Sequence, residues 1–141
     1  MAQVVLITGE PGQGKTYLAD RLSENRICGI VHLDSAYVDF IRDRHPSLYL
    51  SDIACVVSQH YKTVLSVHRL GRSQWKKYVL ALIKEELAGN DLLIVEGYLL
   101  TSVLEDVLKS LPKDTSIVNV IVRDRRYYTE SKINELQSWY L

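Results

Sequence analysis

A single short segment, GEPGQGKT from Gly9 to Thr16, constrains this chain more than any other part of its sequence. It follows the apolar run QVVLIT and precedes KTYLADRLSE, in which Leu18 and Leu22 are spaced about one helical turn apart. The segment fits the pattern G-x-x-x-x-G-K-[ST], which describes a loop that joins a strand to a helix and binds phosphate. The sequence therefore predicts a buried strand over residues 3–8, then a phosphate-binding loop, then a helix.

Each part of this loop has a distinct expected role. Glycines let the backbone fold around an anion, and the helix that follows adds its partial positive end. We expect Lys15 to bridge the β- and γ-phosphates of ATP or another nucleoside triphosphate, and the Thr16 hydroxyl to hold Mg²⁺. The predicted cofactor-binding residues are Gly9, Glu10, Pro11, Gly12, Gln13, Gly14, Lys15 and Thr16. The alternative is a glycine-rich turn without a ligand.

The rest of the chain alternates short apolar runs with longer amphipathic segments. The apolar runs predict three further strands, over residues 27–34, 91–97 and 116–124. Apolar side chains at three- and four-residue spacing predict helices over 15–24, 36–44, 51–65, 73–88 and 102–111, and from about residue 129. Because strands alternate with helices and are apolar on both faces, we expect one three-layer α/β domain, residues 1–141, with a parallel sheet.

Polar residues and glycines predict how several helices begin and end. Ser51 and Ser73 can each cap the helix that follows. Ser102 and Glu105 have the spacing of a capping box, in which the side chain of each residue bonds the backbone N–H of the other. The pair Gly89-Asn90 predicts a left-handed C-terminal cap for the helix before it.

Composition narrows the possible partners and the compartment. The 17 basic and 17 acidic residues cancel, so no global charge favours an anionic membrane or a long nucleic acid as partner. Two cysteines make no disulfide framework, and their spacing does not suggest a metal or redox site. No apolar run approaches the roughly 20 residues that a membrane span needs, and no signal peptide is recognisable. These features predict a cytoplasmic protein.

Two acidic residues come directly after, or at the end of, predicted strands. Asp34 follows IVHL, and Glu96 follows LLIV. The carboxyl ends of parallel strands meet at one edge of the sheet, where ligands of such folds bind. We expect Glu96 to orient Mg²⁺ or its waters, and Asp34 to accept a proton from an acceptor hydroxyl or to join the metal shell. The alternatives are that Asp34 caps the next helix and that Glu96 is structural.

Together, GEPGQGKT, HLDSAYVDF and DLLIVEGYLL resemble the P-loop small-molecule kinases, especially the uridine kinase and nicotinamide riboside kinase group. The resemblance covers residues 1–40 and 91–100. It implies a P-loop NTPase fold with a 2-3-1-4-like strand order and transfer of a phosphoryl group from ATP to a small, nucleoside-like acceptor. It also implies that Asp34 is the base or metal-organising carboxylate, Glu96 the metal-side acid, and Tyr37 a wall of the acceptor pocket.

The end of the chain departs from that family. Its members usually have an arginine-rich lid after the fourth strand and then a fifth strand, whereas here VRDRRYYTESKINELQSWYL follows the fourth strand. We expect Arg123, Arg125 and Arg126 to act as a short lid that stabilises charge on the transferring phosphoryl group, with Arg123 and Arg126 as catalytic residues, or else to be a solvated basic helix start. A fifth strand is missing from the predicted elements. The basic stretch HRLGRSQWKKY, residues 68–78, is either an acceptor contact or an exposed loop.

These residues support two classes of function. The leading hypothesis is a Mg²⁺-dependent kinase that phosphorylates a hydroxyl of a small acceptor, mainly by positioning and charge neutralisation. The alternative is an ATPase or nucleotide-dependent switch that acts with a protein partner. A binding domain that has lost catalysis is a third hypothesis, against which the intact Lys15, Thr16 and Glu96 argue. The acceptor, the preferred base and the oligomeric state stay open.

Overall fold

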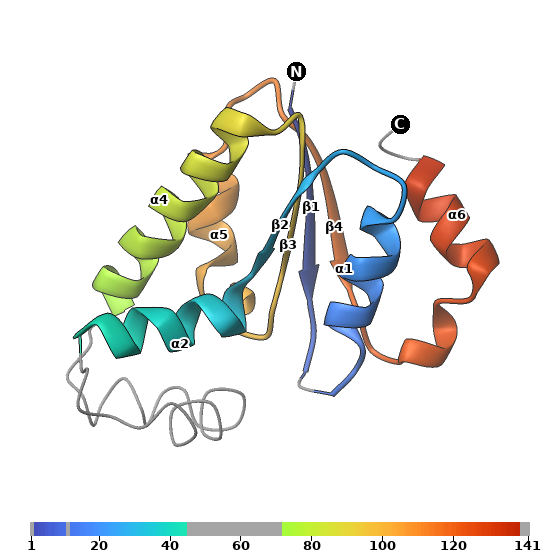
Figure 1. Cartoon of the computed structure of the whole chain (residues 1–141), viewed down its shortest axis with the longest axis horizontal. Helices are drawn as coiled ribbons and strands as arrows, with labels where there is room; N and C mark the ends of the chain where they lie inside the picture. Colours follow the sequence, from blue (N-terminus) through green and yellow to red (C-terminus); the bar gives the residue numbers. More distant parts are fainter. Residues whose placement is uncertain (1, 11, 45–71, 139–141) are drawn as a thin grey trace.

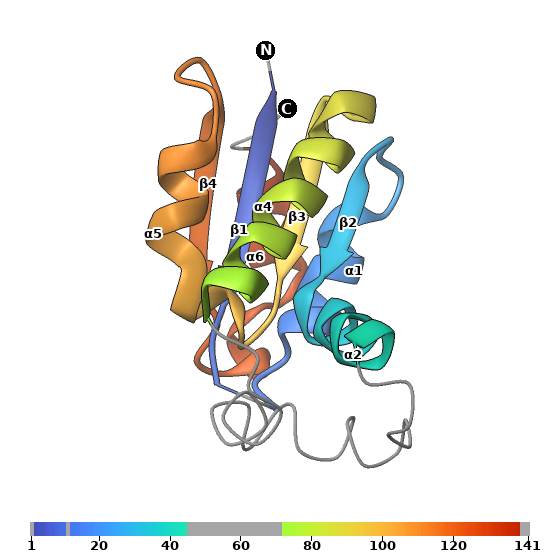
Figure 2. The same ribbon diagram turned by 90° about the vertical axis from the view of Figure 1, so that its left-hand side faces the viewer.

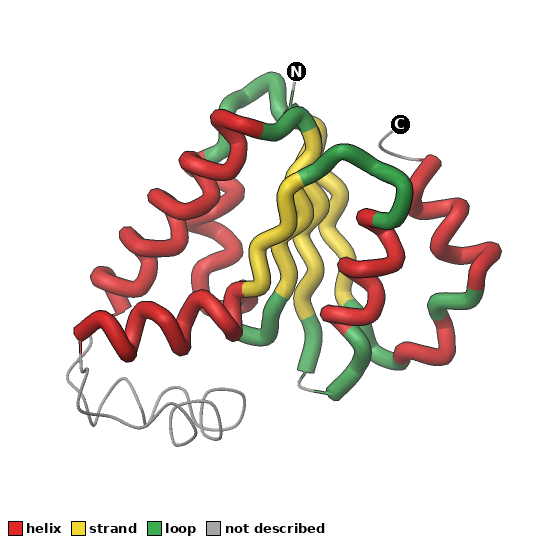
Figure 3. The backbone as a smooth tube through the Cα atoms, viewed as in Figure 1, coloured by secondary structure: helices red, strands yellow, loops and turns green. Residues whose placement is uncertain are grey.

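The computed structural model of the chain describes residues 2–10, 12–44 and 72–138. Four strands and five α-helices alternate along these residues, together with a short 3₁₀ helix, η1 (Figures 1 and 3). The strands are β1 Gln3–Thr8, β2 Gly29–His32, β3 Leu92–Glu96 and β4 Ser116–Ile121. The helices are α1 Lys15–Ser23, α2 Leu33–Arg44, α4 Arg72–Gly89, α5 Leu100–Ser110, η1 Arg125–Tyr127 and α6 Glu130–Ser138. Pro11, and the helix predicted over 51–65 with its Ser51 cap, lie outside the described residues.

The strands form one sheet in the order β2-β3-β1-β4, and every neighbouring pair is parallel. This confirms the predicted α/β class, the parallel sheet and the 2-3-1-4 order. In register, Glu96 of β3 lies beside Ile7 of β1 on one side and His32 of β2 on the other. Because parallel strands all end at the same edge, the loop after β1 and the acids after β2 and β3 meet there. The described part of the sheet has four strands, as predicted.

Helices cover both faces of the sheet. Helices α2, α4 and α5 lie on one face and α1 and α6 on the other, as the two views show (Figures 1 and 2). Alternate side chains of β1 enter the two cores: Val4 and Leu6 pack in the first cluster, Val5 and Ile7 in the second. This period-two alternation is what strand geometry dictates, and it confirms the three-layer arrangement. Among the described helices, none combines the length and the apolar character that a membrane span requires.

Strand β4 is less buried than its sequence predicts. Of its six residues only Val120 is buried, and the side chains of Ile117 and Ile121 are 40% and 58% exposed. β4 is the last strand of the described sheet, and its residues alternate between the two faces. Val118 and Val120 pack in the cluster with α1, whereas Ile117 and Ile121 belong to neither cluster. A buried parallel strand was the wrong expectation because the pattern cannot say which strand is at the edge.

Three of the predicted helix caps are wrong: two at helix starts and one at a helix end. Helix α5 begins at Leu100, so Ser102 lies inside it, where its hydroxyl donates to the carbonyl of Leu99 at 2.9 Å instead of capping an N–H. Helix α4 likewise begins at Arg72 and includes Ser73. At its other end neither Gly89 nor Asn90 has a positive φ. There the Asn90 amide donates to the carbonyl of Glu86 at 2.8 Å, which satisfies that carbonyl without a left-handed residue.

Candidate active site

The loop after β1 turns directly into α1 at the carboxyl edge of the sheet (Figure 1). At its start, Gly9 has φ +149°, and a Cβ there would lie 2.4 Å from the carbonyl oxygen of Val122. Only glycine allows the backbone to pass so close to the end of β4. This close passage puts the first residue of the loop beside the segment that follows β4. The predicted phosphate-binding segment therefore sits where two strand ends and a helix N-terminus converge.

Lys15 is the first residue of α1, and it is only 6% exposed. Its Nζ donates a hydrogen bond to the carbonyl of Glu10 at 2.7 Å, across the loop. Burial lowers the pKa of the ammonium, while the carboxylates of Asp34, Glu96 and Glu10 act in the opposite direction. Lys15 thus holds a positive charge inside the loop, close to both acids that the sequence singled out.

The lowered pKa of Lys15 predicts how stability depends on pH. Since the folded protein binds this proton less tightly than the unfolded chain, Lys15 costs stability at neutral pH, and the cost shrinks as pH rises toward 10.5. We expect Lys15→Met to be more stable than the wild type in urea unfolding at pH 7, and the difference to narrow at pH 10. A difference that is independent of pH would contradict this prediction.

Glu96 connects the loop to β2. The residue is 3% exposed, and its atom Oε1 accepts a hydrogen bond from the hydroxyl of Thr16 at 3.1 Å. The same oxygen lies 2.7 Å from Nδ1 of His32. The side chain of Glu96 points to the α1 face, together with Ile94 and Ile7 from the second core cluster. Thr16, in the first turn of α1, therefore lies within reach of the acid at the end of β3.

The chemistry of these donors fits Mg²⁺. A hydroxyl and a carboxylate are hard oxygen ligands, and Mg²⁺ commonly takes one or two protein oxygens, substrate phosphates and waters. Over the described residues, no group of three or more His, Cys, Asp or Glu side chains could hold a metal by itself. Thr16 and Glu96 could therefore supply two of the oxygen ligands of a Mg²⁺ ion beside the glycine-rich loop.

Asp34 lies in the first turn of α2, and its carboxylate bonds the turn after β3. Its Oδ1 accepts from the backbone N–H of Leu99 at 3.2 Å, and its Oδ2 lies 3.4 Å from that of Tyr98. Gly97, with φ +152°, gives it room, because a Cβ there would lie 3.1 Å from Asp34 Oδ1. Asp34 therefore lies neither in the loop after β2, where we expected it, nor at the position before α2 from which it could cap that helix. Asp34 instead ties the first turn of α2 to the turn before α5, and it lies close enough to influence Lys15.

Among the described residues, Tyr37 packs in the core and does not line the cavity that opens beside the loop, between the ends of β1 and β4 and the start of α5. Tyr37 is completely buried, and its ring centroid lies 5.0 Å from that of Trp75 and 6.2 Å from that of Phe40. The residue lies one turn along α2 from Leu33, on the helix face that packs against α4. The family resemblance implied that Tyr37 is a wall of the acceptor pocket, but α2 begins earlier than expected and its Tyr37 side chain packs in the core.

This correction carries a prediction. We expect Tyr37→Phe to leave nucleotide binding and turnover within about twofold of the wild type, because the ring packs in the core and does not line the cavity beside the loop. Tyr37→Ala, in contrast, should lower the free energy of unfolding by about 3–5 kcal/mol, as loss of a large core ring does. Urea unfolding and steady-state kinetics on both variants measure the two effects. A raised KM for the acceptor in Tyr37→Phe would contradict this prediction and would indicate that the tyrosine contacts the acceptor.

Two of the predicted lid arginines, Arg123 and Arg126, differ in their surroundings, and the side chain of Arg125 lies outside the described part of the structure. Arg123 lines the cavity beside the loop. Arg126 is exposed and paired with Asp124, with an Nη2–Oδ2 distance of 2.8 Å, and its backbone N–H also donates to that carboxylate. The guanidinium lowers the pKa of Asp124. The structure therefore brings Arg123 to the site, while the charge of Arg126 is already balanced within its own segment.

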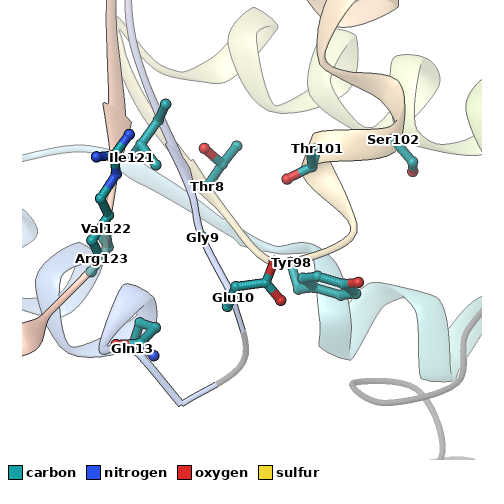
Figure 4. Close-up of a pocket in the computed structure, with 10 residues that line it drawn as sticks. All are labelled: Thr8, Gly9, Glu10, Gln13, Tyr98, Thr101, Ser102, Ile121, Val122 and Arg123. Atoms are coloured by element: carbon teal, nitrogen blue, oxygen red, sulfur yellow. The ribbon is translucent and has the colours of Figure 1, made fainter.

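A cavity of about 610 Å³ opens beside the glycine-rich loop after β1 (Figure 4). It lies between the ends of β1 and β4 and the first turn of α5, from which Thr101 points toward β1. Its volume is that of a typical small-molecule site. The lining residues are Thr8, Gly9, Glu10, Gln13, Tyr98, Thr101, Ser102, Ile121, Val122 and Arg123.

Sequence reasoning missed seven residues of this region, namely His32 and six that line the cavity: Thr8, Tyr98, Thr101, Ser102, Ile121 and Val122. His32 carries a weak signal, since it ends the strand beside the one that ends in Glu96. Tyr98, Thr101 and Ser102 follow the Glu-Gly pair, but which of them line the cavity depends on where α5 begins. Comparison with known proteins adds no relative, because no family model matches the chain and no curated protein matches it. The function of the chain is therefore inferred from the geometry of its site.

Proposed function

We propose that this chain is a small P-loop kinase, which transfers the γ-phosphoryl group of ATP to a hydroxyl of a small acceptor. The observation that carries the proposal is the hydrogen bond between Thr16 and Glu96, with the buried ammonium of Lys15 nearby. Thr16 and Lys15 belong to the loop motif, and Glu96 ends a strand 80 residues later. A turn that only connects β1 to α1 would not need this set of groups in one place.

In the proposed reaction the protein mainly positions charges. Backbone N–H groups of the loop and the N-terminus of α1 would bind the β- and γ-phosphates, and Lys15 would neutralise charge that develops between them. Thr16 and Glu96 would hold Mg²⁺, directly or through water, and this ion supplies charge neutralisation for phosphoryl transfer. Arg123, which lines the cavity beside the loop, would be available to a phosphoryl group bound there.

The cavity beside the loop supports a site for the acceptor. It contains hydroxyl groups from Thr101 and Ser102, an aromatic ring from Tyr98, and an apolar patch from Ile121 and Val122. One acid, Glu10, and one base, Arg123, line it. This balance suits an uncharged, hydroxylated molecule with one apolar face, such as a nucleoside, better than a phosphorylated one.

One observation favours the alternative, an ATPase or nucleotide-dependent switch that acts with a protein partner. Both carboxylate oxygens of Asp34 face backbone N–H groups at the start of α5. Such contacts engage lone pairs of the carboxylate that a general base would have to offer to an acceptor hydroxyl. In a switch, the same contacts would couple the nucleotide site to α5.

One experiment distinguishes the two functions. The purified protein is incubated with Mg²⁺ and γ-labelled ATP, alone and with pools of nucleosides, nucleotides, sugars or oligonucleotides, beside Lys15→Ala and Asp34→Asn. A kinase should move label into one pool, and both variants should lose this transfer. Phosphate released equally with every pool, lost in Lys15→Ala and kept in Asp34→Asn, would refute the kinase and support the ATPase.

A further inference from the structure

The geometry points to His32 as a positioning residue that holds the carboxylate of Glu96 in the orientation needed for Mg²⁺. This inference rests on the proposed function, because it assigns the means by which the proposed metal-side acid is kept in place. His32 is the first residue of the segment HLDSAYVDF, but no role was assigned to it from the sequence. It is linked to the loop and the acids through a single contact, the 2.7 Å separation between its Nδ1 and Oε1 of Glu96.

The backbone fixes this contact. His32 is the last residue of β2, and it is the register partner of Glu96, the last residue of β3. Side chains of register partners on neighbouring strands point to the same face of the sheet. The side chain of Glu96 is 4% exposed, whereas that of His32 is 34% exposed. The histidine therefore lies between solvent and a buried acid that has few ways to satisfy its oxygens.

In the carboxylate form that would bind Mg²⁺, Glu96 only accepts hydrogen bonds, so in this proposal Nδ1 of His32 carries the proton and donates the hydrogen bond. Oε1 of Glu96 then receives two donors, Nδ1–H of His32 and the hydroxyl of Thr16. Two donors on one oxygen fix the rotation of the carboxylate, so the direction of its second oxygen is fixed as well. This is the arrangement by which outer partners orient metal ligands in other metal sites.

Thr16 can take part without giving up its own role. A hydroxyl donates one hydrogen and retains lone pairs, so Thr16 can bond Glu96 and still offer oxygen to Mg²⁺. Without His32, Glu96 would keep only the longer of these two contacts, the one to Thr16 at 3.1 Å. The carboxylate could then turn toward the ammonium of Lys15, with which it already interacts electrostatically. We therefore expect loss of His32 to weaken metal binding and to leave metal-free nucleotide binding intact.

Three substitutions at one position test this role. His32→Asn would place an amide N–H near the position of Nδ1, whereas His32→Gln places its amide farther out and His32→Leu has no donor. The measurement is the Kd of a non-hydrolysable ATP analogue with and without Mg²⁺. The tightening caused by Mg²⁺ should fall about tenfold or more in His32→Leu and His32→Gln, and stay within about threefold of wild type in His32→Asn. The metal-free Kd should stay within about twofold in all three.

A double-mutant cycle shows whether His32 acts through Glu96. In a Glu96→Gln background, His32→Leu should cause no further loss of the Mg²⁺ effect. Equal losses in both backgrounds, or an unchanged Mg²⁺ effect in His32→Leu and His32→Gln, would overturn the inference while the proposed function stands. A wild-type protein whose nucleotide binding does not depend on Mg²⁺ would overturn both.

Discussion

Replacing Lys15 by alanine is expected to lower the rate of phosphoryl transfer, or of ATP hydrolysis, by about 10³-fold. The ammonium is buried inside the loop, where water screens its charge poorly, and it lies among groups that would surround the phosphates. Its main contribution should be to the transition state, because negative charge shifts between phosphates as the bond breaks. Single-turnover kinetics with γ-labelled ATP measure this loss directly.

The control for this prediction is Lys84→Ala, on the exposed face of α4. Its rate should remain within about twofold of the wild type, because exposed charges far from the site have small effects. The Lys15→Ala protein should remain folded, since the substitution removes a buried charge instead of a core side chain. If Lys15→Ala retained more than about a tenth of the wild-type rate, the loop would not be the catalytic phosphate site.

Much of the fold could be predicted because its signals are local. The loop motif gives one strand, one helix and their junction, and apolar runs give the remaining strands. Because the strands of a parallel sheet all end at one edge, the sequence also predicted that Glu96 would lie near the loop. The Thr16–Glu96 hydrogen bond and the effect of Glu96 and Asp34 on Lys15 agree with that expectation.

The features that the sequence could not predict depend on the register of the strands and on the exact residue at which a helix begins. Helix α2 begins at Leu33 instead of 36, which turns Tyr37 into the core and brings Asp34 to the turn before α5. The pairing of His32 with Glu96 requires the strand register, which a single strand pattern does not contain. Exposure of Ile117 on β4 depends on which helices cover that face, a tertiary property.

Replacing Glu96 by glutamine is expected to reduce the rate at saturating Mg²⁺ and ATP by about 10²–10³-fold. Glutamine has nearly the same volume and can still accept from Thr16 through its amide oxygen, so the packing at the end of β3 should be kept. What is lost is the negative charge beside Thr16. Nucleotide affinity without metal should stay constant or increase, since one carboxylate that opposes the phosphates is removed.

The metal dependence decides what this loss means. If Glu96 holds Mg²⁺ or its waters, the concentration of Mg²⁺ that gives half the maximal rate should rise at least about tenfold in Glu96→Gln. Glu105→Gln, on the exposed side of α5, is the matched control and should show the wild-type value. A slow variant with unchanged Mg²⁺ dependence would place Glu96 on the side of the attacking hydroxyl or water. Because Asp34 is already held by the start of α5, that result would make Glu96 the base and Asp34 a structural residue.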